Sequence, residues 1–140
     1  MLKADLKDRF REGSLLLLSD DLQTRLTGIR TLEQISKESD EHYWHVMDLL
    51  TAYIRRNASY EPRYAGRGTL IGRDIETVLS VIARRSHYYG NGESAPLNLE
   101  EAILQGSSAL KASHLEGSNL YRADLSGADL RGTNLRGTNL

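Results

Sequence analysis

The chain has 140 residues, which suits one compact domain or two small parts that share a core. Its 18 Lys and Arg residues nearly balance its 19 Asp and Glu residues, which excludes an overall field that attracts or repels nucleic acid. It contains no cysteine, which excludes disulfides, thiolate nucleophiles and zinc sites built on sulfur.

The start of the chain and its hydropathy carry no export or membrane signal. Residues Met1 to Arg9 are charged and lack the apolar stretch and the cleavage site of a signal peptide. The longest aliphatic run, Leu15 to Leu18, is far shorter than the roughly 20 residues that cross a bilayer. We therefore expect a soluble, cytoplasmic protein with no membrane span.

Residues 1–90 have helical periodicity and predict a helical N-terminal domain of about four helices. Asp20 and Gln23 form an N-cap signature for the second helix, and Ser39 is expected to cap the third. A fourth helix is predicted from about Arg73 to Ser86, after an irregular stretch at 57–72. Each helix has one apolar stripe for burial; the four stripes are Leu6, Phe10 and Leu17; Leu22, Leu26, Ile29, Leu32 and Ile35; Tyr43, Val46, Met47, Leu50, Tyr53 and Ile54; and Ile75, Val78, Leu79 and Ile82.

From Leu110 onward a leucine recurs every five residues. A small residue stands two positions before each leucine, Asn or Asp stands before most of them, and Gly often stands two positions after. Leu99 and Leu104 keep the period upstream, and one extra residue among Gln105 to Ala109 shifts its phase. The leucines that we expect to form the repeat core are Leu110, Leu115, Leu120, Leu125, Leu130, Leu135 and Leu140.

A five-residue period fits neither an α-helix nor a flat strand, and it favours a solenoid over a disordered low-complexity tract. Each unit would form one side of a square coil, with the leucine and the small residue inside and Asn, Asp or Gly at the corner. Successive coils would then be joined by backbone hydrogen bonds at roughly 4.8 Å spacing. The sequence thus predicts an α+β fold: helices over 1–90, then a right-handed quadrilateral β-helix of about two coils over 97–140.

The units Ala123–Gly127 and Ala128–Gly132 match the pattern A-(D/N)-L-x-x, so the repeat resembles the pentapeptide-repeat family. Upstream, the stretches Arg25–Ile35, His45–Arg55 and Asp74–Arg85 are similar to the helical segment that precedes the repeats in many bacterial members. The resemblance implies a bacterial protein whose helical part packs onto or leads into the first coil. It implies little about activity, because a fold does not give a function.

Some pentapeptide-repeat proteins mimic DNA and modulate type II topoisomerases, which requires a long acidic rod. Here the repeat region is short and almost neutral. Its acidic residues are Glu100, Glu101, Glu116, Asp124 and Asp129, and its basic residues are Lys111, Arg122, Arg131 and Arg136. A DNA mimic is therefore the weakest of the functions considered.

Catalytic and metal-binding patterns are weak in this sequence. His42, His45 and Asp48 have a spacing that could hold a metal, but a polar helix start explains them better, because no H-E-x-x-H motif or cysteine pair accompanies them. The stretch Gly66–Gly72 misses the G-x-G-x-x-G spacing and is not followed by lysine. We expect no enzyme, no cofactor and no metal.

The stretch from Tyr53 to Tyr89 is rich in arginine and tyrosine, which together clamp phosphates and stack on bases. Alternatively, these arginines pair with acids of neighbouring helices or neutralise helix C-termini. The candidate anion or nucleic-acid contacts are Arg55, Arg56, Arg63, Tyr64, Arg67, Arg84 and Arg85.

The function that these patterns favour is a non-enzymatic protein-interaction or scaffold module with an unidentified protein partner. Nucleic-acid or anion binding through residues 53–89 is the alternative. The repeat stops at Leu140 in mid-pattern without a cap, which predicts weak self-association through the open coil.

Overall fold

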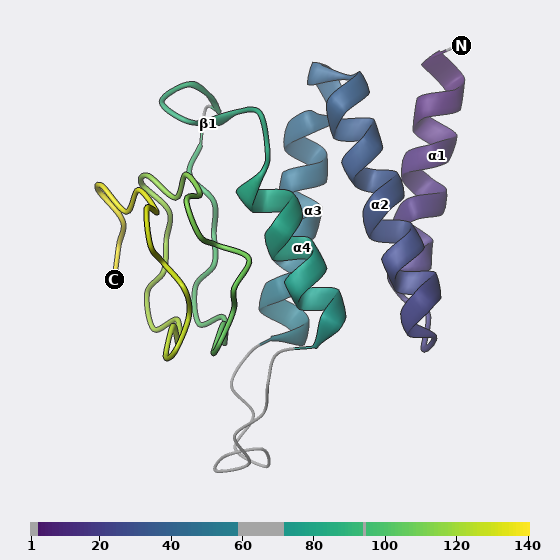
Figure 1. Ribbon diagram of the computed structural model, residues 1–140. Coiled ribbons are helices and arrows are strands. Elements are labelled where there is room, and N and C mark those ends of the chain that lie inside the picture. The colour runs from purple at the N-terminus through teal and green to yellow at the C-terminus, as the bar shows by residue number, and fades with distance from the viewer. Residues whose placement is uncertain (1–2, 59–71, 94) are drawn as a thin grey trace. The chain divides into compact units, whose positions relative to one another are not determined.

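The computed structural model describes residues 3–58, 72–93 and 95–140. These residues form the helices α1 (Lys3–Leu16), α2 (Leu22–Glu38), α3 (Asp40–Asn57) and α4 (Arg73–Ala83), followed by the short strands β1 (Tyr88–Tyr89) and β2 (Gly92–Glu93) (Figure 1). By its internal contacts the chain divides into two compact units, residues 1–50 and 51–140, so the boundary falls within α3. The prediction of domains at 1–90 and 97–140 stays a prediction.

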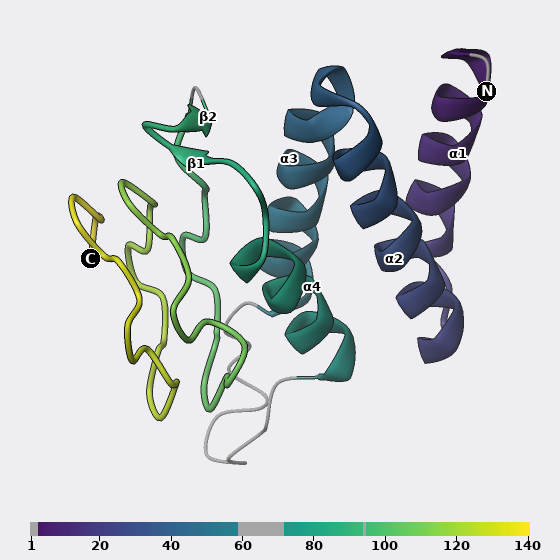
Figure 2. The same cartoon turned by 45° about the horizontal axis from the view of Figure 1, so that its top comes forward.

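In the first unit, α1 and α2 lie side by side (Figures 1 and 2). Gly28 of α2 permits their close approach, because a Cβ at this position would lie 2.8 Å from the carbonyl oxygen of Gly13. Arg9 and Glu38 form an ion pair of 2.6 Å between the same two helices. Of the predicted α2 stripe, Leu26, Ile29, Leu32 and Ile35 are buried, and the burial of these side chains from water stabilises the helix.

The caps of α2 and α3 follow the predicted chemistry with one correction. Asp21 rather than Asp20 caps α2: its carboxylate accepts the backbone N–H of Thr24 at 2.9 Å and the hydroxyl of Thr24 at 2.7 Å. The prediction was wrong by one residue because adjacent aspartates offer the same side chain, and only the helix start decides between them. Ser39 accepts the backbone N–H of His42 at 3.3 Å through its hydroxyl, as a cap of α3 does.

In the second unit, α4 buries the predicted stripe of Ile75, Val78, Leu79 and Ile82. The helix ends at Ala83, before the predicted end at Ser86. Arg84 is its C-cap residue, and Arg85 beyond it turns to an ion pair with Glu93. The early end is therefore explained by a charge pair with a residue eight positions further on, beyond the predicted helix.

Residues 97–140, which we name the ladder segment, run back alongside themselves (Figure 1). The first pass (97–118) pairs with the second pass (119–138), and Asn139 and Leu140 begin a third. Parallel bridges join Asn98 to Asn119 and Ile103 to Asp124 before the extra residue, and His114 to Asn134 and Asn119 to Asn139 after it. The later partners lie 20 residues apart, as Asn119 and Asn139 do. The earlier partners lie one residue further apart, so the phase shift is absorbed without loss of pairing.

Backbone hydrogen bonds run along the whole ladder segment. Leu104 N–H donates to the carbonyl of Asp124 at 2.8 Å, and Leu115 N–H donates to that of Asn134 at 3.0 Å. The pairing occurs through isolated bridges; among the described residues only β1 and β2 are strands, with Tyr88 opposite Gly92. The coarse α+β class is thus observed as four helices with a short strand region.

Burial of the repeat leucines decreases along the ladder segment. Leu97, Leu99, Leu104, Leu110, Leu115 and Leu120 are buried. Leu125, Leu130 and Leu135 are half-buried, and Leu140 is 71% exposed. Each pass therefore covers the inward side chains of the pass before it.

Candidate interaction surface

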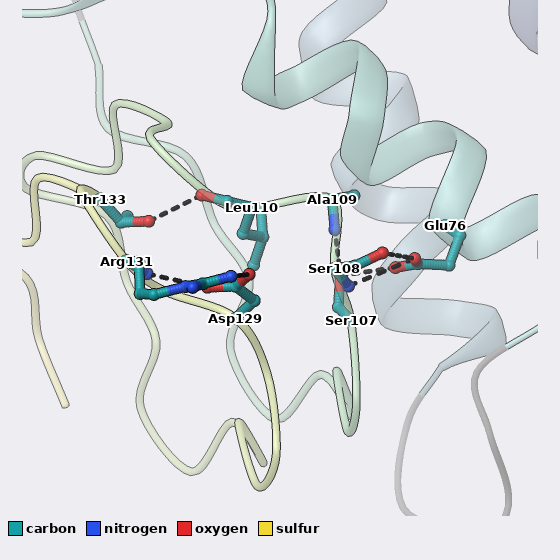
Figure 3. Close-up of polar contacts among 8 residues, drawn as sticks. All are labelled: Glu76, Ser107, Ser108, Ala109, Leu110, Asp129, Arg131 and Thr133. Atoms are coloured by element: carbon teal, nitrogen blue, oxygen red, sulfur yellow. Dashed lines mark hydrogen bonds and ion pairs between the residues drawn. The ribbon is translucent and has the colours of Figure 1, made fainter.

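Helix α4 contacts the ladder segment where the phase shift occurs (Figure 3). The Glu76 carboxylate accepts the hydroxyl of Ser107 at 2.5 Å and the hydroxyl of Ser108 at 3.2 Å. The backbone N–H of Ser108 points at the same carboxylate at 3.4 Å, and Ala109 N–H donates to the Ser107 hydroxyl at 3.2 Å. The extra residue thus forms a small bulge, and one helical side chain accepts the donors of its two serines.

The residues that end α3 contact the first pass in a similar way. Arg55 donates through Nη1 to the carbonyl oxygen of Asn98 at 2.7 Å, and Ile103 N–H donates to the carbonyl of Ala58. These groups belong to the edge of the first pass that faces away from the second pass. The helical part of the second unit therefore satisfies backbone groups that a sheet edge would otherwise expose.

Arg85 and Glu93 form a buried ion pair beside the ladder segment. The Arg85 Nε donates to Glu93 Oε2 at 2.9 Å and Nη2 donates to Oε1 at 3.2 Å, with side-chain exposures of only 2% and 0%. Arg85 also donates through Nη1 to the carbonyl of Ile82 at 2.9 Å. The removal of either partner would leave a buried charge, so this pair is structural.

The residues around β1 pack against the ladder segment at His114. The Tyr88 ring stacks on the His114 ring with centroids 3.9 Å apart and an interplanar angle of 5°. His114 Nδ1 lies 2.6 Å from Glu116 Oε1. Burial raises the pKa of Glu116, but hydrogen bonds from His114 and the backbone, with the nearby Arg85 charge, outweigh it and hold this pKa below its usual value.

The predicted arginine and tyrosine contacts are spread over several elements. Arg85 is occupied by Glu93 and Arg55 by the Asn98 carbonyl, whereas Arg56 and Arg84 lie exposed. Arg63, Tyr64 and Arg67 lie outside the described residues. The anion-binding prediction for this set stays a prediction.

The outer surface of the ladder segment carries a cluster that the sequence reasoning did not single out. The Arg122 guanidinium lies 5.2 Å from the Tyr121 ring centroid, and Arg122 Nη1 lies 3.9 Å from Glu101 Oε1 of the first pass. We name Glu101, Tyr121 and Arg122 the Arg122 corner. The signal was present in the sequence, because Arg122 stands where glycine stands two positions after most repeat leucines.

Other polar side chains on the ladder segment are paired with one another. Asp129 accepts Arg131 Nε at 2.9 Å and Nη2 at 2.8 Å, and Thr133 donates to the carbonyl of Leu110 at 2.7 Å (Figure 3). Asn139 donates through Nδ2 to Asn119 Oδ1 at 3.3 Å. The Asn139–Asn119 bond joins side chains of successive passes, whereas the Asp129–Arg131 contacts lie within one pass.

The described residues contain neither a metal-binding cluster nor a membrane-spanning helix. Within 3–58, 72–93 and 95–140, no group of three or more His, Asp or Glu side chains is placed to hold a metal ion. His42 Nδ1 lies 3.0 Å from the Ser39 hydroxyl, within the start of α3. None of the described helices is both long and apolar enough to cross a membrane.

Comparison with known families identifies the repeat. Residues 108–140 match the family model described as Pentapeptide repeats, in eight copies. Comparison with curated proteins and with solved structures found no match. The match starts within the stretch 105–109 that contains the extra residue, near the point where the unbroken five-residue period begins. Residues 108–140 are therefore pentapeptide repeats, and they follow a helical N-terminal part.

Proposed function

We propose that this chain is a non-enzymatic protein-interaction or scaffold module that binds a protein partner through the outer surface of its repeats. The observation that carries the proposal is the regular ladder segment, whose exposed polar side chains stand in columns such as Asn119 with Asn139. Such a surface is rigid before binding, so little conformational entropy is lost when a partner docks.

The architecture that we propose is a right-handed quadrilateral β-helix of about two coils over residues 97–140, preceded by a helical domain over 1–90. The spacing of 20 residues between paired positions supports it, since this equals four repeat units per coil. The buried leucines of the first pass also support it. We place the protein in the bacterial cytoplasm, on the resemblance of its helical segment and the missing cysteines.

The hydroxyl groups of the repeat support a structural rather than a catalytic use. Ser113 is buried and donates to the carbonyl of Leu110 at 2.7 Å, and Ser107 donates to Glu76. Among the described residues, neither hydroxyl makes a hydrogen bond to a histidine that would activate it as a nucleophile. A purified protein that turned over a panel of esters, phosphates or glycosides at enzyme-like rates would refute the proposal.

Selection of random short peptides on the immobilised full chain tests the proposal directly. We expect enriched peptides whose binding the free protein competes away. If no peptide is enriched, the outer surface does not bind polypeptide and the proposal fails.

The alternative function is nucleic-acid or anion binding by the arginine-rich stretch 53–89. Arg56 is exposed at the end of α3, which favours it, whereas Arg85 is neutralised by Glu93, which does not. Anisotropy of labelled DNA and RNA at low and near-physiological salt tests it, because phosphate contacts weaken steeply with salt. Charge reversal at Arg63 and Arg67 should then abolish binding. Modulation of a type II topoisomerase by DNA mimicry is a weaker proposal, since acidic and basic residues nearly balance.

Self-association through the repeat is a further part of the proposal. The half-buried leucines at 125, 130 and 135 offer apolar area at the second pass. Sedimentation velocity over a range of concentrations tests it, and a single monomer species at the highest concentration would contradict it.

A further inference from the structure

The Arg122 corner combines a disfavoured backbone conformation with charged side chains. The residue two positions after a repeat leucine has a positive φ, and glycine fills this place at 106, 117, 127, 132 and 137. Glu101, Ala112 and Arg122 adopt the same conformation, with φ of 60°, 58° and 59°. Because a side chain is disfavoured at such φ values, glycine would give a more stable ladder at all three.

Two of these residues lie next to each other across the passes. Glu101 N–H donates to the carbonyl of Tyr121 at 2.8 Å, and the Glu101 and Arg122 side chains are 58% and 68% exposed. The exposed Glu101–Arg122 ion pair contributes little stability, so folding stability does not account for charged residues at these two positions. A function that uses the side chains does.

Arg122 is oriented, and its charged partner among the described residues is an exposed contact of 3.9 Å with Glu101. Its guanidinium is held over the Tyr121 ring, yet it makes no hydrogen bond to any residue that the structure describes. Arg131, by contrast, donates twice to Asp129, and Arg85 donates to Glu93. A guanidinium that an aromatic ring holds in place is prepared to bind a carboxylate or phosphate with two parallel hydrogen bonds.

The surrounding charges decide between these two ligands. Glu101 lies 3.9 Å from Arg122; Glu100 precedes Glu101 in sequence, and Asp124 lies two residues after Arg122. Hydrogen bonds from the Ser126 hydroxyl and backbone, and from Gln105, hold the pKa of Asp124 below its usual value, so this carboxylate is charged at neutral pH. These acids repel the many charges of a nucleic-acid backbone more strongly than the single charge of one carboxylate, so a carboxylate is the ligand that they disfavour less.

The neutral groups beside the corner fit a polypeptide. Tyr121 is 41% exposed, and its N–H donates to Asn119, whose amide pairs with that of Asn139. Tyrosine and arginine are the residue types that most often dominate the binding energy of protein interfaces. Amide columns of this kind can exchange hydrogen bonds with the backbone of a partner.

We propose that the Arg122 corner is the surface that binds the protein partner, and that Arg122 receives an acidic side chain of this partner. The inference deepens the proposed interaction function and rests on it. It commits to a polypeptide with an exposed Asp or Glu side chain.

The test uses the full chain and the peptides enriched by selection on it. Arg122→Gln should weaken the binding of acidic peptides about tenfold or more, and Tyr121→Ala should weaken it similarly, because both remove the oriented guanidinium. Arg136→Gln is the matched control. Arg136 is an exposed arginine elsewhere in the ladder segment, and it has no aromatic partner among the described residues. Its affinity for the peptides should not change.

A second readout separates binding from a purely structural role. Arg122→Gly should raise the melting temperature while it abolishes peptide binding, and Ala112→Gly should raise the melting temperature and leave binding intact. A lower melting temperature for Arg122→Gly would show that the Arg122 stack stabilises the fold, which would overturn the inference.

The remaining outcomes are equally decisive. Peptides that bind wild type, Arg122→Gln and Arg136→Gln alike would overturn the inference but leave the proposed function standing. A selection without any enriched peptide would end both. If labelled DNA binds the wild-type protein but not the Arg122→Gln variant, the corner binds nucleic acid and not a protein.

Discussion

At the scale of single residues, the inward serines of the ladder segment differ in whether their hydroxyl groups have a partner. Ser113 donates to the carbonyl of Leu110, whereas the buried Ser118 hydroxyl finds no acceptor among the described residues. A buried donor that lacks a partner costs free energy, and a satisfied one contributes. We expect Ser118→Ala to raise the free energy of unfolding by about 1 kcal/mol and Ser113→Ala to lower it by about 1 kcal/mol. Urea denaturation measures both, and changes of the same sign would contradict this prediction.

Part of the folding stability should depend on pH through the Asp129 carboxylate. Hydrogen bonds from the Arg131 side chain, and then from the Arg131 backbone, lower the pKa of Asp129 from 3.8 to about 2. Because the folded pKa is the lower one, the contribution of Asp129 is complete above about pH 4 and is lost as the pH falls towards 2. Arg131→Gln should move this pKa up towards 3.8, as carboxyl carbon NMR shifts would record. An unchanged titration would mean that Arg131 does not make these bonds in solution.

At the scale of elements, the Glu76 contact couples α4 to the bulge of the ladder segment. Glu76→Ala leaves the buried Ser107 hydroxyl without its acceptor, so we expect a loss of about 1–3 kcal/mol in unfolding free energy. Ser108→Ala, which removes only the exposed partner, should cost less. A double-mutant cycle of Glu76→Ala with Ser107→Ala isolates their coupling, and additive effects would show that the contact contributes nothing.

The β1 region and the ladder segment should depend on each other through Gly117. A Cβ at Gly127 would meet no atom closer than 3.8 Å, so Gly127→Ala should cost only about 1 kcal/mol for its positive φ. A Cβ at Gly117 would lie 2.7 Å from the Tyr89 ring, so Gly117→Ala should cost more. Thermal denaturation measures the two, and Tyr89→Ala in the Gly117→Ala background should recover the difference. Equal costs would mean that Tyr89 does not pack on this position.

The sequence predicted the elements whose stabilising residues lie close together along the chain. The helices were found because their apolar stripes and caps lie within a few residues of one another, as with Leu26, Ile29 and Ser39. The strands β1 and β2 were missed, because the sequence around Gly90 and Gly92 is typical of a loop and the Tyr88 contact with His114 joins residues far apart in sequence. Arg122 was missed as a candidate for the same reason, since the sequence does not show that Glu101 lies beside it.

At the scale of the whole molecule, the grouping of contacts differs from the grouping of sequence patterns. The pattern changes between residues 90 and 97, whereas the compact units meet at residues 50 and 51. The reason is that residues 51–58 and α4 make hydrogen bonds with the ladder segment through Arg55, Ala58 and Glu76. Composition and periodicity describe how each segment folds, but they do not reveal which segments share contacts.

The order of the passes should appear as a gradient of local stability. Leu104 and Leu115 donate their amides to the next pass, whereas the amides of Leu130 and Leu135 have no acceptor in the described part of the chain. We therefore expect amide hydrogen exchange to be slower at Leu104 and Leu115 than at Leu130 and Leu135, as NMR of residues 1–140 in deuterated water would record. Uniform exchange along the repeat would mean that it opens only as a whole.

The spacing of 20 residues between paired positions limits how such a gene can lengthen. Duplication of one five-residue unit after Leu125 would shift every later residue to another column, so Asn139 would no longer stand over Asn119. Duplication of 20 residues would return every later residue to its original column, one pass further along the segment. The single extra residue before Leu110 is accommodated because Glu76 binds the serines that it displaces. An insertion of 20 residues therefore preserves a binding surface, whereas an insertion of a single five-residue unit creates a different surface.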